Sequence, residues 1–166
     1  MDNKKKICFV CLGNIVRSPL AENLFLHQAD AGNVVEKYEV DSAGTSAYHI
    51  GERPDARMRR VAASHGLTYD GEARRFLKRD LDYFDLIIAM DRENIFDLEY
   101  LISADDHREK IHLLREFDPL AEEGAIVPDP YYGGIHGFEE VYKIVERSTL
   151  GLLQALEADQ LNSIKS

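Results

Sequence analysis

Residues 6–25, KICFVCLGNIVRSPLAENLF, decide the fold and mark its site. The first part, Ile7 to Leu12, is a short apolar run of the kind that forms a buried strand. The second part, Pro19 to Gln28, has apolar residues at helical spacing, with Ser18 placed to cap the helix and Pro19 suited to its first turn. The segment between them is therefore a loop that leaves a buried strand and enters a helix N-terminus.

Three further apolar runs predict strands, and helical patterns separate them. The strands are expected at Tyr38 to Ser42, Leu86 to Met90 and Ile111 to Leu114. The helices are expected at Asp55 to Ser64, Glu93 to Ile102 and Phe138 to Leu156. Strands that alternate with helices favour a parallel sheet with helices on both faces, a three-layer α/β fold. No linker or repeat divides the chain, so we expect one domain over residues 1–166, with a core at about 6–157.

Length and composition restrict the class of protein. A chain of 166 residues with 45% hydrophobic residues has the usual size of one domain. No apolar run is long enough to span a bilayer and no small-residue cleavage site follows the N-terminus, which predicts a cytoplasmic protein without a membrane partner. The formal net charge of -10 argues against nucleic acid as the main partner, although basic residues concentrate in the first half.

Two cysteines, Cys8 and Cys11, form a C-x-x-C pattern that could indicate a redox pair or half a zinc site. On one strand, however, two positions three apart lie about 10 Å apart on opposite faces, beyond the reach of a disulfide. The histidines show no ligand spacing, so a structural zinc site is not expected. We predict no metal and no other cofactor.

The loop at residues 11–18 carries the chemistry. Ligands of parallel α/β sheets bind at the carboxyl ends of strands, where Cys11 is expected. Successive N–H groups around Gly13, at a helix N-terminus, favour phosphate. Such surroundings also favour the thiolate, and Arg17 can hold two phosphoryl oxygens as a planar fork. A lone cysteine is more often inert core, so it is the coincidence of glycine, helix start and arginine that indicates a site.

A cysteine phosphatase also needs a proton donor, because a phenolate is a poor leaving group. Residues 127–132, VPDPYY, supply a candidate. Two prolines fix the backbone around Asp129, and the adjacent tyrosines offer ring faces to an aromatic substrate. Taken alone, a Pro-Asp-Pro segment is more often a rigid surface turn.

Taken together, these segments resemble the low-molecular-weight protein tyrosine phosphatases, from Ile7 to about Leu156. The matching pieces are Val10 to Ile15 with Arg17-Ser18-Pro19, Asp41 to Thr45, Pro54 to Arg57, Met90-Asp91, Asp129 to Gly133 and Phe138-Glu139. The resemblance implies a four-stranded parallel sheet with a phosphate-binding loop after the first strand. It also implies a metal-free, two-step hydrolysis of phosphate monoesters through a phosphocysteine.

The resemblance assigns roles to individual residues. Cys11 is the nucleophile, Arg17 the phosphate clamp and Asp129 the general acid and base. Phosphate is bound by the loop amides, at Leu12, Gly13, Asn14, Ile15, Val16 and Ser18. Ser42 braces the loop through Asn14, Ser18 stabilises the thiolate, and three tyrosines line the mouth: Tyr48, Tyr131 and Tyr132. The expected partners are phosphotyrosine-containing proteins or peptides and small aryl phosphates.

Two positions depart from the family pattern. Many members have a second loop cysteine where this chain has Val16, so we expect oxidised Cys11 to lack a protecting disulfide. Members often have a histidine just before the x-Ala-Arg segment, hydrogen-bonded to the loop serine, whereas this chain has Gly71. The support of Ser18 is therefore an open question.

Other functions remain as alternatives. An arsenate reductase on this fold needs more cysteines, and a thiol-redox protein needs a pair that can meet. A protein-arginine phosphatase tends to carry threonine where Ile15 stands. A phosphate- or phosphoprotein-binding module without turnover would not need Cys11, Arg17 and Asp129 together.

Overall fold

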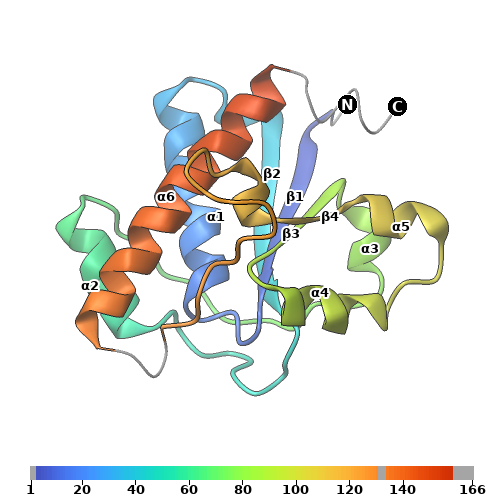
Figure 1. Cartoon of the computed structure of the whole chain (residues 1–166), viewed down its shortest axis with the longest axis horizontal. Coiled ribbons are helices and arrows are strands. Elements are labelled where there is room, and N and C mark those ends of the chain that lie inside the picture. The colour runs from blue at the N-terminus through green and yellow to red at the C-terminus, as the bar shows by residue number, and fades with distance from the viewer. Residues whose placement is uncertain (1–2, 131–133, 159–166) are drawn as a thin grey trace.

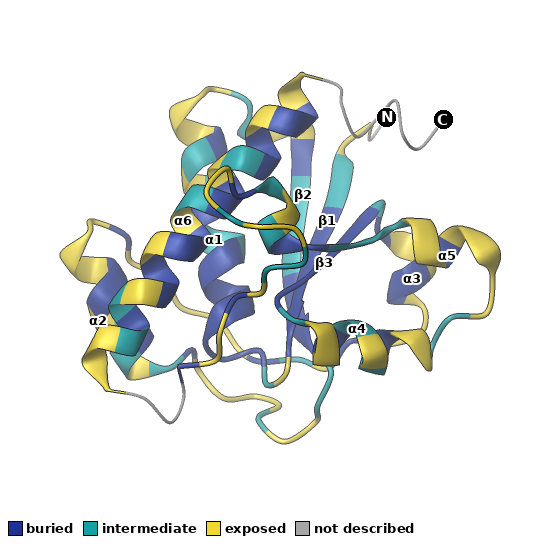
Figure 2. Ribbon diagram, viewed as in Figure 1, coloured by how far each residue is buried: buried dark blue, intermediate teal, exposed yellow. Residues whose placement is uncertain are grey.

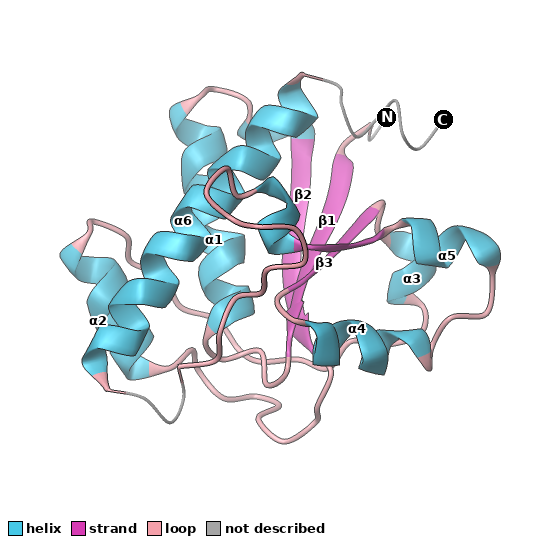
Figure 3. Cartoon of the chain, viewed as in Figure 1, coloured by secondary structure: helices cyan, strands magenta, loops and turns pink. Residues whose placement is uncertain are grey.

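The computed structural model, which describes residues 3–130 and 134–158, is built around four parallel strands (Figures 1 and 3). The strands are β1 (Lys5–Cys11), β2 (Tyr38–Gly44), β3 (Leu86–Ala89) and β4 (Ile111–Leu113). Their order is β2-β1-β3-β4, and each neighbouring pair is parallel. The first strand is therefore paired on both sides, and its carboxyl end lies in the middle of one edge of the sheet.

Helices cover both faces of the sheet, which confirms the three-layer α/β fold (Figure 3). The helices are α1 (Arg17–Ala31), α2 (Ala56–Ser64), α3 (Asp80–Tyr83), α4 (Arg92–Glu99), α5 (Asp105–Glu109) and α6 (Ile135–Glu157), with short 3-10 turns η1 (Val35–Lys37) and η2 (Leu114–Phe117). One face carries α1, α2 and α6, and the other carries α3 and α4. Among the described residues, no helix is both long and apolar enough to cross a membrane.

Two hydrophobic clusters form the core, one on each face of the sheet (Figure 2). Alternate residues of β1 enter different clusters: Phe9 and Cys11 pack toward α1 and α6, whereas Cys8 and Val10 pack toward α3 and α4. Both cysteines are free thiols. The prediction that Cys8 and Cys11 lie on opposite faces of a strand is confirmed.

One local prediction is wrong. The helix after the loop begins at Arg17 rather than Pro19, its N-cap is Val16, and no side chain caps it. Ser18 does not cap the helix because its hydroxyl instead faces the thiol of Cys11. Ser18, which was expected to cap the helix, thus lies in its first turn and contacts Cys11 and Asn14.

Candidate active site

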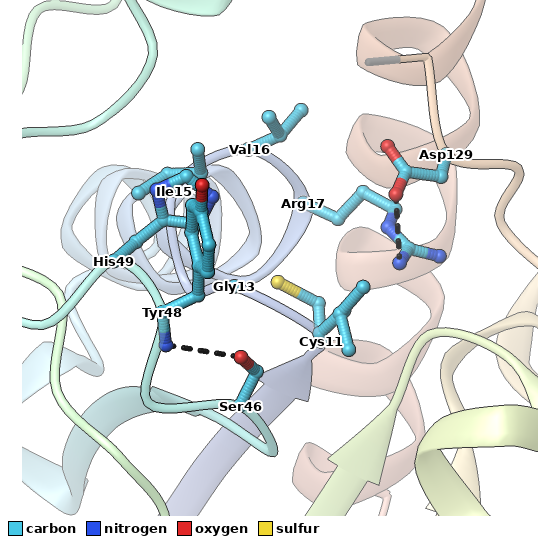
Figure 4. Close-up of a pocket in the computed structure, with 10 residues that line it drawn as sticks. Cys11, Gly13, Ile15, Val16, Arg17, Ser46, Tyr48, His49 and Asp129 are labelled. Carbon is cyan, nitrogen blue, oxygen red and sulfur yellow. Dashed lines mark hydrogen bonds and ion pairs between the residues drawn. The ribbon is translucent and has the colours of Figure 1, made fainter. Parts of the chain in front are cut away.

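The loop at residues 12–16 leaves the carboxyl end of β1 and enters α1, and a cavity of about 470 Å³ lies over it (Figure 4). The cavity is lined by Cys11, Leu12, Gly13, Ile15, Val16, Arg17, Ser46, Tyr48, His49 and Asp129. The parallel topology explains why segments so far apart in sequence meet here, since the carboxyl ends of the strands share one edge of the sheet.

Three carbonyl groups, at the end of β1 and in the loop, form hydrogen bonds with the protein behind the loop. The carbonyls of residues 11, 12 and 15 accept hydrogen bonds of 2.8 to 2.9 Å from the N–H groups of Thr45, Ser46 and Asp55. Within residues 3–130 and 134–158, the N–H groups of residues 12–16 donate to no protein acceptor. Buried N–H groups normally have partners, so this curved row of donors suits an oxyanion.

Asn14 fixes the shape of the loop. Its backbone has φ 58°, in the left-handed region that asparagine tolerates better than most residues. The Oδ1 atom of Asn14 accepts the N–H of Arg74 at 2.9 Å, while Nδ2 donates to Ser18 Oγ at 2.8 Å and to Ser42 Oγ at 3.0 Å. Because Oδ1 is bound to a donor, the orientation of the amide is fixed and both serine oxygens act as acceptors.

The thiol of Cys11 lies at the floor of the cavity and is 2% exposed. Its Sγ is 3.0 Å from Ser18 Oγ, where either atom could be the donor. The Ser18 oxygen already accepts from Asn14, so its own proton is available to the sulfur. The Ser18 hydroxyl can therefore donate a hydrogen bond to the sulfur of Cys11.

Arg17 is almost entirely buried and is held in place at one end of its guanidinium. Its Nη1 donates to Asp91 Oδ2 at 2.6 Å and to the carbonyl of Val127 at 2.9 Å. Its Nη2 lies 3.7 Å from Asp129 Oδ2. Burial alone would lower the pKa of Arg17, but Cys11 and the neighbouring carboxylates raise it above its ordinary value. The guanidinium therefore presents a fixed positive charge beside the sulfur.

Asp129 and the aromatic wall stand on opposite sides of the cavity. Figure 4 shows Tyr48 and His49 on one side of Cys11, with Arg17 and Asp129 on the other. The ring of Tyr48 is 84% exposed and meets the His49 ring edge to face at 4.9 Å. The Asp129 side chain is 40% exposed. A flat aromatic group attached to a phosphate would thus enter between a ring and a carboxyl group.

Behind the loop, a buried carboxyl group extends the hydrogen-bond network. Ser42 Oγ donates to Glu22 Oε1 at 2.6 Å. Burial raises the pKa of Glu22 to about 7, and Asp41 adds to the rise, whereas the hydrogen bond from Ser42 and the charge of Arg74 oppose it. Glu22 thus supports Ser42, the residue through which Asn14 is braced.

Gly71 stands where many family members have a histidine, so no side chain at this position supports Ser18. A small cavity of about 200 Å³ is lined by Gly71 together with Glu22, Ser42 and Asn14, and a Cβ atom built on Gly71 would meet nothing within 4 Å. No side chain from Gly71 reaches the network, and Glu22 is instead the partner of Ser42. Ser18 keeps its support through Asn14 without a histidine.

Gly44 allows the end of β2 to lie against the loop. A Cβ atom at this position would come within 2.8 Å of the Leu12 carbonyl oxygen and 3.1 Å of the Asn14 nitrogen. Both are backbone atoms, which cannot rotate away. The close approach of β2 to the loop therefore requires glycine.

The structure brings most of the expected site residues together. Three of them, Asn14, Ser18 and Ser42, have side chains that interact behind the loop rather than lining the cavity. Tyr131 and Tyr132 lie outside the described residues. The residues that the sequence analysis did not assign are Glu22, Ser46, His49 and Asp91. Asp91 could have been found, because it lies two residues after the end of β3, at the edge of the sheet where Cys11 lies.

Comparisons with known proteins agree with this geometry. Residues 6–162 match the family model described as low molecular weight phosphotyrosine protein phosphatase. A low molecular weight protein-tyrosine-phosphatase of Streptomyces coelicolor is 41% identical over 91% of this chain and 93% of its own length. The human low molecular weight phosphotyrosine protein phosphatase is 40% identical over 90% of this chain and 94% of its own.

Solved structures show the same similarity. The crystal structure of a protein tyrosine phosphatase from Entamoeba histolytica, with Hepes in its active site, superposes with a TM-score of 0.89 at 39% identity. The match covers 95% of this chain and 99% of that one. The crystal structure of YfkJ from Bacillus subtilis gives a TM-score of 0.86 at 36% identity, and the match covers 94% of this chain and 96% of that one.

Proposed function

Because the chain belongs to the low molecular weight phosphotyrosine protein phosphatase family and is a protein-tyrosine phosphatase, we propose that Cys11, Arg17 and Asp129 carry out its reaction. One observation supports the assignment above the others. The Cys11 sulfur lies at the floor of a cavity next to the loop at residues 12–16, whose N–H groups have no protein acceptor among the described residues, and Arg17 and Asp129 lie on one side of it.

In the first step, the Cys11 thiolate attacks phosphorus. The sulfur–phosphorus bond forms while the bond from phosphorus to the tyrosine oxygen breaks, and Asp129, as the carboxylic acid, gives its proton to that oxygen. The N–H groups of the loop, with Nε and Nη2 of Arg17, bind the three non-bridging oxygens, whose charge is redistributed in the transition state. The contact of Arg17 with Asp91 keeps the guanidinium in place throughout.

In the second step, water attacks the phosphorus of the phosphocysteine. Asp129, now a carboxylate, takes a proton from the water, the sulfur–phosphorus bond breaks and inorganic phosphate leaves. The hydroxyl of Ser18 donates to the departing thiolate, which lowers the barrier to its release. The enzyme returns to its starting state with no group consumed other than water.

The substrates we propose are phosphotyrosine in proteins or peptides and small aryl phosphates. Tyr48 lines the cavity and offers an exposed ring to an aryl group. The relatives reported above are named for phosphotyrosine, and nothing in them favours phosphoarginine or a module without turnover. Location in the cytoplasm stays a prediction.

The test is hydrolysis of p-nitrophenyl phosphate and of a phosphotyrosine peptide, with EDTA present, by wild type, Cys11→Ser and Asp129→Asn. We expect EDTA-resistant turnover that Cys11→Ser abolishes. Asp129→Asn should lower kcat for the peptide by about a hundredfold or more, because the poor leaving group needs its proton. An unchanged kcat in Asp129→Asn would assign the acid to another residue, and turnover by Cys11→Ser would refute the cysteine mechanism.

A further inference from the structure

A second cavity, of about 490 Å³, lies beside the active-site pocket and shares Leu12 and Ser46 with it. Leu12, whose side chain is 46% exposed, forms part of the ridge between the two. The opposite wall comes from α4, which lies at the same edge of the sheet as the loop (Figure 1). We call this second cavity the side groove; its lining includes Leu12, Ser46, Arg75, Phe76, Lys78 and Tyr100.

The side groove has an apolar and aromatic surface. Phe76 is 3% exposed and belongs to the hydrophobic cluster beneath, so it offers a fixed apolar base. Tyr100 is 76% exposed and is oriented by an edge-to-face contact with Phe96 at 5.3 Å. Exposed rings of this kind bury a large apolar area on binding and lose little rotational freedom, which is why tyrosines are common in peptide-binding surfaces.

The charges of the side groove differ from those of the chain as a whole. Arg75 and Lys78 are exposed, and neither forms an ion pair with another residue of the ranges 3–130 and 134–158. Asp97, on α4, lies in the lining with them. The chain carries a net charge of -10, which repels acidic substrates at long range. Two cations next to the catalytic pocket locally offset that repulsion.

We propose that the side groove binds the substrate residues next to phosphotyrosine and favours an acidic side chain beside an apolar one. The inference rests on the proposed function. With the phosphate at Cys11, the peptide backbone lies at the mouth of the pocket, and the residues on one side of the phosphotyrosine cross Leu12. An acidic side chain then pairs with Arg75 and Lys78, while the apolar neighbour packs against the aromatic surface. Asp97 repels the acidic side chain of the peptide from the α4 side of the groove, so the acidic side chain is directed toward Arg75 and Lys78.

The experiment compares kcat/KM for p-nitrophenyl phosphate with kcat/KM for phosphotyrosine peptides flanked by Asp and Leu or by Lys and Leu. Each peptide is made with the flank before and after the phosphotyrosine. For at least one of the two directions we expect wild type to favour the acidic flank by about tenfold. The double variant Arg75→Glu with Lys78→Glu should reverse this preference and leave p-nitrophenyl phosphate hydrolysis within about twofold, because it lies outside the catalytic pocket.

A matched double variant, Arg60→Glu with Lys143→Glu, makes the same change in net charge at exposed sites outside both cavities. It should keep the preference for the acidic flank. If wild type hydrolyses the acidic and basic peptides at equal rates, the side groove has no role in substrate preference, and the proposed function is unaffected. The same conclusion follows if the control variant loses the preference as fully as the double variant at Arg75 and Lys78. A wild type that hydrolyses none of the substrates would overturn the proposed function, and the side groove with it.

Discussion

The front and the back of the phosphate-binding loop differ in how their hydrogen-bonding groups are used. At the front, the N–H groups of residues 12–16 have no protein acceptor among the described residues, and Cys11 faces an open cavity. At the back, Asn14 uses its carbonyl oxygen once and its amino group twice, and Ser42 is held in turn by Glu22. The hydrogen-bonding groups of the same short segment thus lack protein partners on one side and have them on the other.

This difference indicates how the site is preorganised. Donors that are to bind a phosphate must not have protein partners, and a loop with so many free donors would not keep its shape unaided. The network behind it supplies the missing constraint, since each polar group there has a partner. Changes at the front should therefore reduce catalysis with little effect on stability, and changes at the back should reduce both.

The largest effect is expected at the front, from Arg17→Lys. Lysine keeps the charge, but one ammonium group cannot hold Asp91 and the carbonyl of Val127 and also bind two phosphoryl oxygens. We expect kcat/KM for a phosphotyrosine peptide to fall about a thousandfold. Arg57→Lys is the matched control, because Arg57 lies on α2 outside the cavity, and it should stay within about threefold of wild type. A loss below tenfold in Arg17→Lys would show that charge alone suffices.

At the back, Asn14→Gly and Asn14→Ala separate the network from the backbone. Both variants leave the N–H of Arg74 and the oxygen of Ser18 without their partner, but glycine tolerates φ 58° and alanine does not. We expect both to lower kcat at least tenfold and to lower the free energy of unfolding, by about 2 kcal/mol for glycine and about 1 kcal/mol more for alanine. Urea unfolding measures this. If both variants are as stable as wild type, the hydrogen bonds of Asn14 are not what holds the loop in shape.

Glu22→Gln tests the buried carboxyl group through pH. The pKa of Glu22 is raised to about 7 in the folded protein and is near its ordinary value of 4.5 when unfolded, so the folded state binds more protons between these values. Ionising Glu22 therefore lowers the free energy of unfolding of wild type as pH rises from about 4.5 to 7, and Glu22→Gln lacks this loss. The free energy of unfolding of Glu22→Gln, relative to that of wild type, should increase by about 2 to 3 kcal/mol between pH 5 and pH 8. A difference that does not change with pH would contradict the prediction.

The smallest effect is expected from the second cysteine. Burial raises the pKa of Cys8 well above its ordinary value, although Arg74 opposes the shift, so the thiol stays protonated and unreactive. Cys8→Ala should leave kcat within about twofold. Because Cys8 and Cys11 lie on opposite faces of β1, dithiothreitol should restore little activity after peroxide treatment of either protein. Full recovery in wild type and none in Cys8→Ala would show that the two thiols can meet.

The fold was largely predictable because its elements carry strong patterns. Apolar runs bounded by polar residues identify all four strands, each within two residues of its observed ends. The short helices α3 and α5 were not foreseen, since four or five residues are too few to show a helical period. The position of Cys11 at the carboxyl end of β1 followed from the topology alone.

The back of the site was less predictable, because it depends on contacts between distant segments. Glu22 is on the polar side of an otherwise ordinary helical pattern, and its role appears only once β2 has brought Ser42 beside it. The prediction that Ser18 caps the helix failed for the same reason. A serine hydroxyl can cap a helix N-terminus or form a hydrogen bond with a thiol, and the sequence does not distinguish the two. His49 shows no motif and enters the site only through the turn of the segment after β2.

Trapping the phosphoenzyme tests the central claim most directly. In Asp129→Asn, p-nitrophenyl phosphate should still react with Cys11, because its leaving group does not need a proton, while hydrolysis of the intermediate is slowed. A rapid denaturing quench followed by peptide mass spectrometry should find phosphate on the peptide at the position of Cys11, and Cys8→Ser in the same background should not remove it. Phosphate on any other residue, or release of nitrophenol without a covalent phosphoenzyme, would contradict catalysis through a phosphocysteine.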